Sequence, residues 1–121
     1  MKKTVIIGAT ENQSRYAYIA AEMLQEYNQE FVPVGIKAGD VLGKKILDLR
    51  TLPEINDVDT ITLYINPQKQ KEWYDYFFKL NPRRVIFNPG TENPELEKLL
   101  AHKNIEALEA CTLVLLRSGQ F

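Results

Sequence analysis

The stretch Thr4-Val5-Ile6-Ile7-Gly8-Ala9-Thr10, near the start of the chain, indicates the class of fold. Its apolar residues are consecutive rather than alternating, which is typical of a strand buried on both faces of a parallel sheet. Gly8 then allows a sharp turn, and a helical pattern follows over residues 14–28. The stretch therefore predicts the first strand and turn of a βαβ unit.

Four further β-prone runs follow this first strand, over residues 30–36, 60–65, 84–88 and 104–109. Helical patterns cover residues 67–80 and the segment after Asn93, which is a typical N-cap residue before Pro94. Segment 37–58 is less regular, and we expect a loop, a short extended piece around residues 46–47 and a helical turn at 52–56. The sum is an α/β fold: one Rossmann-like domain over residues 1–121, with a five-stranded, mostly parallel sheet and helices on both faces.

Composition and charge narrow the functional classes. The chain has 121 residues, of which 45% are hydrophobic and 26% charged, as in an ordinary globular protein. Its net charge of −1 argues against a general nucleic-acid-binding protein and against a protein that binds anionic membranes. One cysteine excludes an intrachain disulfide. The first apolar run is too short for a signal peptide or a membrane span, so we expect a cytoplasmic protein.

The first turn is a candidate phosphate site. Ligands of such sheets bind outside the carboxyl ends of the strands, and the N-terminus of the next helix attracts anions. Thr10 and Ser14 add hydroxyl groups there, and Arg15 adds a positive charge. The three-glycine fingerprint of dinucleotide sites is absent, because Gly8 is followed by no second or third glycine. A phosphate site and a purely structural turn both remain open on these residues.

Lys37 distinguishes between nucleotides. A site for NAD usually places Asp or Glu after the second strand, where it binds the ribose. This chain has Val34-Gly35-Ile36-Lys37, and a lysine attracts an additional phosphate on the ribose. The residue therefore disfavours NAD and favours a phosphorylated nucleotide such as coenzyme A (CoA) or NADP. The alternative is that Lys37 is a solvated loop residue.

Five blocks of sequence, in this order and spacing, carry a resemblance to a known family. They cover residues 5–10 with Ser14, 31–34 with Lys37 and 42–46, 58–67, 85–90 with 93–95, and 109–113. The chain resembles the small CoA-binding domain proteins, which are similar to the CoA-binding domain of succinyl-CoA synthetase α subunits and of acyl-CoA synthetases. The resemblance covers nearly the whole chain and implies a Rossmann-like fold that binds CoA at the carboxyl edge of its sheet.

The resemblance also implies a role for each matching residue. The pyrophosphate would be held by the first turn, through Gly8, Ala9, Thr10, Ser14 and Arg15. Lys37 would face the 3′-phosphate of the nucleotide. The adenine or pantetheine path would be lined by Ile65, Asn66 and Pro67, and the thiol end bordered by Asn88, Pro89 and Gly90.

Two basic residues that are frequent in relatives are absent here. Relatives often carry a basic residue after the third strand, where this chain has Tyr64-Ile65-Asn66. Many have Asp-Arg-Cys near the final strand, where this chain has Glu109-Ala110-Cys111. These departures leave a different ligand open.

No residue is assigned a catalytic or metal-binding role. His102 lies near the end of a predicted helix, and Cys111 has no second cysteine with which to form a metal pair. We therefore expect a non-catalytic protein that binds CoA or a short acyl-CoA. The alternatives are a nicotinamide-nucleotide-binding protein, a partner-dependent acyl-CoA synthetase component, or an interaction module with a vestigial pocket. The apolar tail over residues 113–116 packs on the domain or on a second copy, which leaves a homodimer open.

Overall fold

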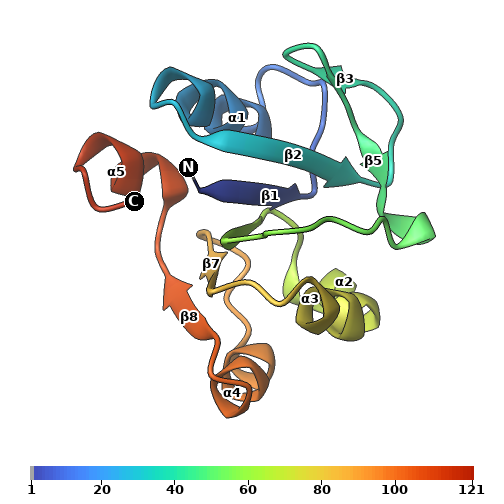
Figure 1. Ribbon diagram of the computed structural model, residues 1–121, viewed down its shortest axis with the longest axis vertical. Coiled ribbons are helices and arrows are strands. Elements are labelled where there is room, and N and C mark those ends of the chain that lie inside the picture. The colour runs from blue at the N-terminus through green and yellow to red at the C-terminus, as the bar shows by residue number, and fades with distance from the viewer. Residues whose placement is uncertain (1) are drawn as a thin grey trace.

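A six-stranded parallel sheet forms the centre of the structure, a computed structural model that describes residues 2–121 (Figure 1). Its strand order is β5-β2-β1-β6-β7-β8, and every neighbouring pair is parallel. This is the order of a Rossmann sheet, with β5 in the place of the third strand. The strands are β1 (Lys3–Ile7), β2 (Glu30–Gly35), β5 (Leu47–Asp48), β6 (Thr60–Leu63), β7 (Arg84–Phe87) and β8 (Glu106–Glu109).

Helices cover both faces of this sheet, as Figure 1 shows. One face is covered by α1 (Tyr16–Glu26) and α5 (Thr112–Arg117). The other face is covered by α3 (Tyr74–Leu80) and α4 (Pro94–His102). Between β6 and α3 the chain passes through α2 (Pro67–Gln70) and the 3₁₀ turn η2 (Lys71–Trp73).

The central strand β1 explains why its apolar residues are consecutive. Ile6 packs against the α1 side of the sheet, whereas Val5 and Ile7 pack against the α3 side. All three side chains are fully buried. The predicted class of fold, a parallel α/β sheet with helices on both faces, is therefore confirmed.

The prediction of five strands is wrong, because the short extended piece in segment 37–58 forms β5. Two residues, Leu47 and Asp48, pair with the end of β2. The hairpin of β3 (Asp40–Val41) and β4 (Lys44–Lys45) stands in place of a crossover helix before β5.

Two helical predictions differ from the structure in detail. The turn predicted at 52–56 is the 3₁₀ turn η1 (Leu49–Thr51), because the Asp48 side chain accepts a hydrogen bond from the Arg50 N–H. Leu52 then adopts a left-handed φ of 50° and ends the turn. The helix predicted over 67–80 is interrupted at Trp73, whose φ of −112° and ψ of 8° separate η2 from α3.

The apolar tail packs on its own domain. Residues 113–116 lie within α5, and Leu113 and Leu116 join the buried cluster that contains the residues of α1. Among the described residues, no helix has both the length and the apolar character that a membrane span requires.

The end of β2 and the first turn approach each other closely. The backbone N–H groups of Gly8 and Ala9 both donate to the Val34 carbonyl oxygen, at 2.9 and 3.0 Å. A Cβ atom at position 35 would lie 2.7 Å from the Ala9 carbonyl oxygen, which is a backbone atom and cannot easily move. Gly35 is therefore required by packing rather than by an unusual φ angle.

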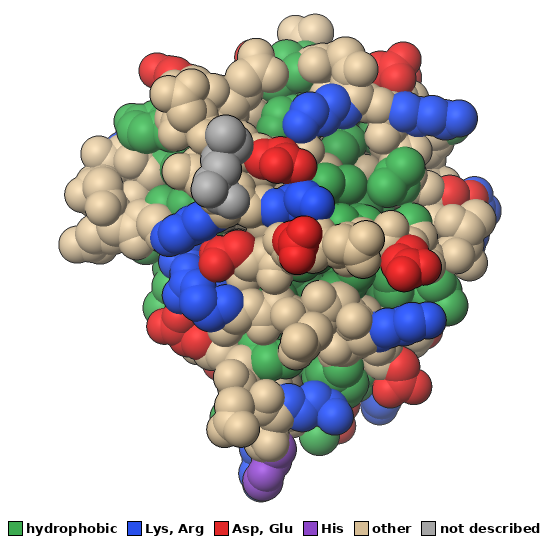
Figure 2. All heavy atoms as spheres, in the orientation of Figure 1, with side chains coloured by type: hydrophobic (Ala, Val, Ile, Leu, Met, Phe, Trp, Pro, Cys, Tyr) green, Lys and Arg blue, Asp and Glu red, His purple; other side chains and the backbone are tan. Residues whose placement is uncertain are grey.

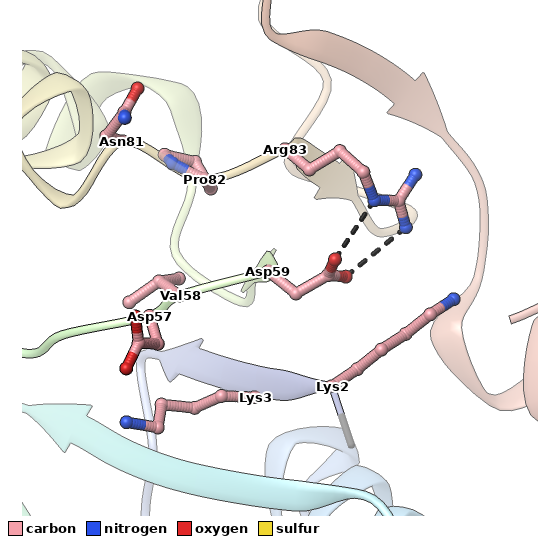
Figure 3. A pocket seen from close by; sticks show the side chains of 8 residues that line it. All are labelled: Lys2, Lys3, Asp57, Val58, Asp59, Asn81, Pro82 and Arg83. Carbon is pink, nitrogen blue, oxygen red and sulfur yellow. Dashed lines mark hydrogen bonds and ion pairs between the residues drawn. The ribbon is translucent and has the colours of Figure 1, made fainter.

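The amino edge of the sheet is held by an ion pair, which Figure 3 shows beside Lys2 and Lys3 in an open hollow. Arg83 Nε and Nη2 donate to the Asp59 carboxylate at 3.0 and 3.2 Å. Burial alone raises the pKa of Asp59, but hydrogen bonds from Arg83 and Thr60 outweigh it and hold the pKa below its usual value. The ionised carboxylate therefore contributes to stability.

Replacing Gly35→Ala is expected to destabilise the fold by about 1–3 kcal/mol, because the added methyl group forces the first turn away from β2. Urea unfolding at neutral pH measures this as a lower midpoint with an unchanged slope. A variant as stable as the natural chain would contradict the close approach of these two segments.

Replacing Arg83→Gln is expected to lower stability most at neutral pH. Because the folded pKa of Asp59 is depressed, the stabilisation is present above the unfolded pKa and is lost as the pH falls through the folded one. The difference in unfolding free energy between the two proteins should shrink below about pH 4. Urea titrations at several pH values test this, and a difference that is independent of pH would contradict it.

Candidate functional site

A cleft of about 730 Å³ lies at the carboxyl edge of the sheet. Its walls are the turns that follow β1, β2, β6 and β7, together with the start of α1 and residues of α2 and η2. The connection after β1 leads to β2, and the connection after β6 leads the other way to β7. The cleft therefore occupies the point where the strand order reverses, which is where open α/β sheets bind ligands.

Most of the predicted site residues line this cleft. They are Gly8, Ala9, Thr10, Arg15, Lys37, Ile65, Asn66, Pro89 and Gly90. Ser14, Pro67 and Asn88 do not belong to its lining. The structure thus brings nearly all of the predicted positions together, while their roles toward a ligand stay predictions.

The first turn is closely packed and offers fewer free amides than expected. A Cβ atom on Gly8, whose φ is +97°, would lie 2.9 Å from Cγ2 of Ile65. The N–H groups of Gly8 and Ala9 already donate to Val34. Within residues 2–121, the N–H groups of Tyr16 and Ala17 at the start of α1 have no protein acceptor. The free donors of the cleft therefore come from α1 rather than from the glycine turn.

Asn12, which the sequence reasoning missed, shapes the segment between the turn and α1. Its Oδ1 accepts hydrogen bonds from the Ser14 N–H at 3.0 Å and from the Ser14 hydroxyl at 2.7 Å. The Asn12 N–H donates to the Thr10 hydroxyl oxygen at 3.1 Å. Asparagine is a common turn residue because its side chain can accept a hydrogen bond from the backbone N–H two residues on, and this preference could have indicated the role. The Ser14 hydroxyl is thus engaged within the turn.

Three cations line the cleft: Arg15, Lys37 and Lys69. All three are exposed, and none forms an ion pair within the part of the chain that the structure describes. Glu72 is the acidic residue among the lining side chains, so the cleft carries a positive excess. Such an excess favours an anionic ligand.

Lys69 is a cleft residue that the sequence analysis did not single out. The Asn66 side chain caps α2 by accepting a hydrogen bond from the Lys69 N–H at 2.9 Å. Lys69 lies on α2, which follows β6 in the chain, and it adds a positive charge to this side of the cleft. The spacing of Asn66, Lys69 and Trp73 on one helical face was the available signal.

Apolar side chains complete the walls of the cleft. Tyr16 and Ile36 line it with exposed fractions of 71% and 52%, and Ile65 and Trp73 are half-buried. Burial raises the pKa of Tyr64 to about 12, so its hydroxyl stays neutral at physiological pH. The arrangement can therefore hold a flat or extended apolar group beside charged phosphates.

Asn88 has a structural role in the interior. Its side-chain amide donates to the Thr62 hydroxyl at 2.7 Å and to the Leu63 carbonyl at 2.9 Å. Its Oδ1 accepts a hydrogen bond from the Thr112 N–H at 2.9 Å. The side chain is only 2% exposed and ties β6, β7 and α5 together, so its hydrogen-bonding groups point away from the cleft.

Other reactive side chains lie away from the cleft. His102 ends α4 and is exposed. Figure 2 shows a face of the molecule on which acidic and basic side chains are interspersed. Cys111 precedes α5 and does not line the cleft. Residues 2–121 contain no cluster of His, Cys, Asp and Glu side chains suited to a metal ion.

Solved structures share this fold. A crystal structure of an uncharacterized protein is 57% identical, with a TM-score of 0.96, and the match covers 100% of this chain and 98% of the other. The protein cell-free ID.343 from Thermus thermophilus is 23% identical, with a TM-score of 0.83, covering 99% of this chain and 90% of the other. A search of the curated proteins found no match.

A larger enzyme contains a similar unit. The acetyl-coenzyme A synthetase 1 of Ca. Korarchaeum cryptofilum, solved with phosphate and ADP, is 19% identical, with a TM-score of 0.71. The match covers 90% of this chain and 25% of that enzyme, and at this identity it shows a shared fold. The sequence pattern of the CoA binding domain family matches residues 2–117. The chain therefore belongs to the family of CoA-binding domains.

Proposed function

We propose that this chain binds CoA or a short acyl-CoA in the cleft at the carboxyl edge, and performs no catalysis by itself. The observation that carries the proposal is that three cations without an ion pair among residues 2–121 lie in one cleft with the N-terminus of α1. CoA presents a 3′-phosphate and a pyrophosphate beside an adenine ring and an extended arm. The charges and the apolar walls of the cleft match this combination. In keeping with the sequence expectation, the proposal places the protein in the cytoplasm.

The pyrophosphate would lie against the start of α1. In the described part of the chain the N–H groups of Tyr16 and Ala17 have no acceptor there, and the helix dipole favours negative charge at this end. Arg15 adds a full positive charge, and the Thr10 hydroxyl is free to donate. The backbone N–H groups of Gly8 and Ala9 already donate to the Val34 carbonyl oxygen. These two residues would therefore contribute by allowing the ligand to approach the backbone closely.

The nucleotide end would lie over the end of β2. Lys37 would pair with the 3′-phosphate, and the exposed side chain of Ile36 would cover one side of the adenine. Ile65, across the first turn from β2, would begin the apolar wall along which the pantetheine arm leaves the nucleotide. A lysine at this position favours an additional phosphate on the ribose and so favours CoA over NAD.

The pantetheine arm would run from Asn66 toward Pro89 and Gly90. Pro67 begins α2 and Asn88 is buried, so both would shape this path through the backbone. Lys69 would replace the basic residue that relatives often carry after the third strand. It adds a charge near the pyrophosphate from α2 rather than from the strand end.

A thermal-shift titration with CoA, acetyl-CoA, NADP, NAD and ATP at matched concentrations tests the proposal. CoA and acetyl-CoA are expected to raise the unfolding midpoint, since ligand at 100 times its Kd stabilises by about 2.7 kcal/mol. Recovery of intact acetyl-CoA after incubation checks the absence of catalysis. A shift with NADP alone would support a nicotinamide nucleotide instead, and no shift with any CoA species would refute CoA binding.

The substitution Lys37→Ala is expected to lower the affinity for CoA by roughly tenfold and the affinity for dephospho-CoA much less, because only CoA carries the 3′-phosphate. Calorimetric titration measures both affinities. Lys98→Ala is the matched control, because Lys98 is also exposed, lies on α4 and does not line the cleft. Equal losses for CoA and dephospho-CoA would refute the role assigned to Lys37.

A further inference from the structure

We infer that Gln70, which does not line the cleft, is the positioning residue that sets the distance between two of its walls. The inference rests on the proposed function. One wall is the segment Ile65–Asn66 after β6, and the other is the segment Pro89–Thr91 after β7. Together they form the end of the cleft that would receive the pantetheine arm, away from the end of β2.

The side-chain amide of Gln70 joins these two walls directly. Its Nε2 donates to the Ile65 carbonyl oxygen at 2.9 Å and to the Thr91 carbonyl oxygen at 2.8 Å. Ile65 and Thr91 both line the cleft. The two N–H bonds of one planar amide therefore fix two backbone segments from neighbouring strands relative to each other.

The oxygen of the same amide secures the second wall at its far end. Gln70 Oε1 accepts a hydrogen bond from Asn93 Nδ2 at 2.9 Å. Asn93 also caps α4, because its Oδ1 accepts from the Leu96 N–H. The Pro89–Thr91 segment is thus held between Gln70 and a capped helix, with little freedom to adjust to a ligand.

Only an amide side chain fits this position. It must supply two donors and one acceptor, which glutamate, methionine and lysine do not. Gln70 is fully buried, so water cannot readily replace a lost bond, and removal of the amide leaves two carbonyl groups without a donor. A change here should therefore alter the spacing of the walls while leaving the lining side chains in place.

Two ligands separate this role from a general effect on folding. Adenosine 3′,5′-bisphosphate carries the nucleotide end of CoA and would occupy only the part of the cleft near β1 and β2. Intact CoA would also pass between the two walls. Gln70→Met is expected to lower the affinity for CoA roughly tenfold and to change the affinity for the bisphosphate by less than about twofold. Calorimetric titration of both ligands provides the measurement.

Gln68→Met is the matched control, because Gln68 lies on the same helix but is exposed. It should leave both affinities unchanged. If Gln70→Met does not fold, Gln70→Asn serves instead, since it keeps the amide group on a side chain that is one methylene too short to reach both carbonyl groups. The same selective loss of CoA affinity is expected.

The outcomes are distinct. Equal losses for both ligands, or no loss for either, in a natural chain that binds CoA would overturn the role of Gln70 and leave the proposed function standing. A natural chain that binds neither ligand would overturn the proposed function, and the inference with it. Selective loss of CoA in Gln70→Met, with Gln68→Met unchanged, would support the inference.

Discussion

One carbonyl oxygen, that of Val34, governs the geometry of the carboxyl edge. It accepts hydrogen bonds from the amides of Gly8 and Ala9, so the chain that leaves β1 bends across the end of β2. The bend is possible because position 35 has no Cβ to meet the Ala9 carbonyl. It uses the amides that glycine-rich turns usually offer to phosphate, and leaves the free N–H groups at the start of α1. The position of the proposed anion site follows from this packing constraint.

The main strands could be predicted because they are buried on both faces, which the consecutive apolar residues of β1 and β7 reveal. The short strand β5 was predicted only as an extended piece, because two residues such as Leu47 and Asp48 have no pattern that indicates pairing with the sheet. Their pairing with the end of β2 is decided by tertiary contact. The break at Trp73 could not be predicted either, because the helical spacing of apolar residues continues over residues 67–80 while the backbone geometry changes.

The candidate site could be predicted where residues directly follow a strand, because parallel strands bring their carboxyl ends to one edge. Lys37, Asn66 and Gly90 are of this kind. The prediction was weaker where side-chain direction matters: Asn88 also follows a strand, yet its amide turns inward to Thr62 and Thr112. Lys69 reaches the cleft from a helix, and its contribution depends on where that helix lies over the sheet.

The ends of the strand order also affect how the sheet meets other molecules. A parallel sheet leaves unpaired backbone groups on its two outermost strands, which can recruit further strands and lead to aggregation. Here one outermost strand, β5, is only two residues long. The other, β8, begins and ends with the exposed carboxylates of Glu106 and Glu109. The shortness of β5 and the like charges on β8 discourage further strands from pairing with the two borders of the sheet.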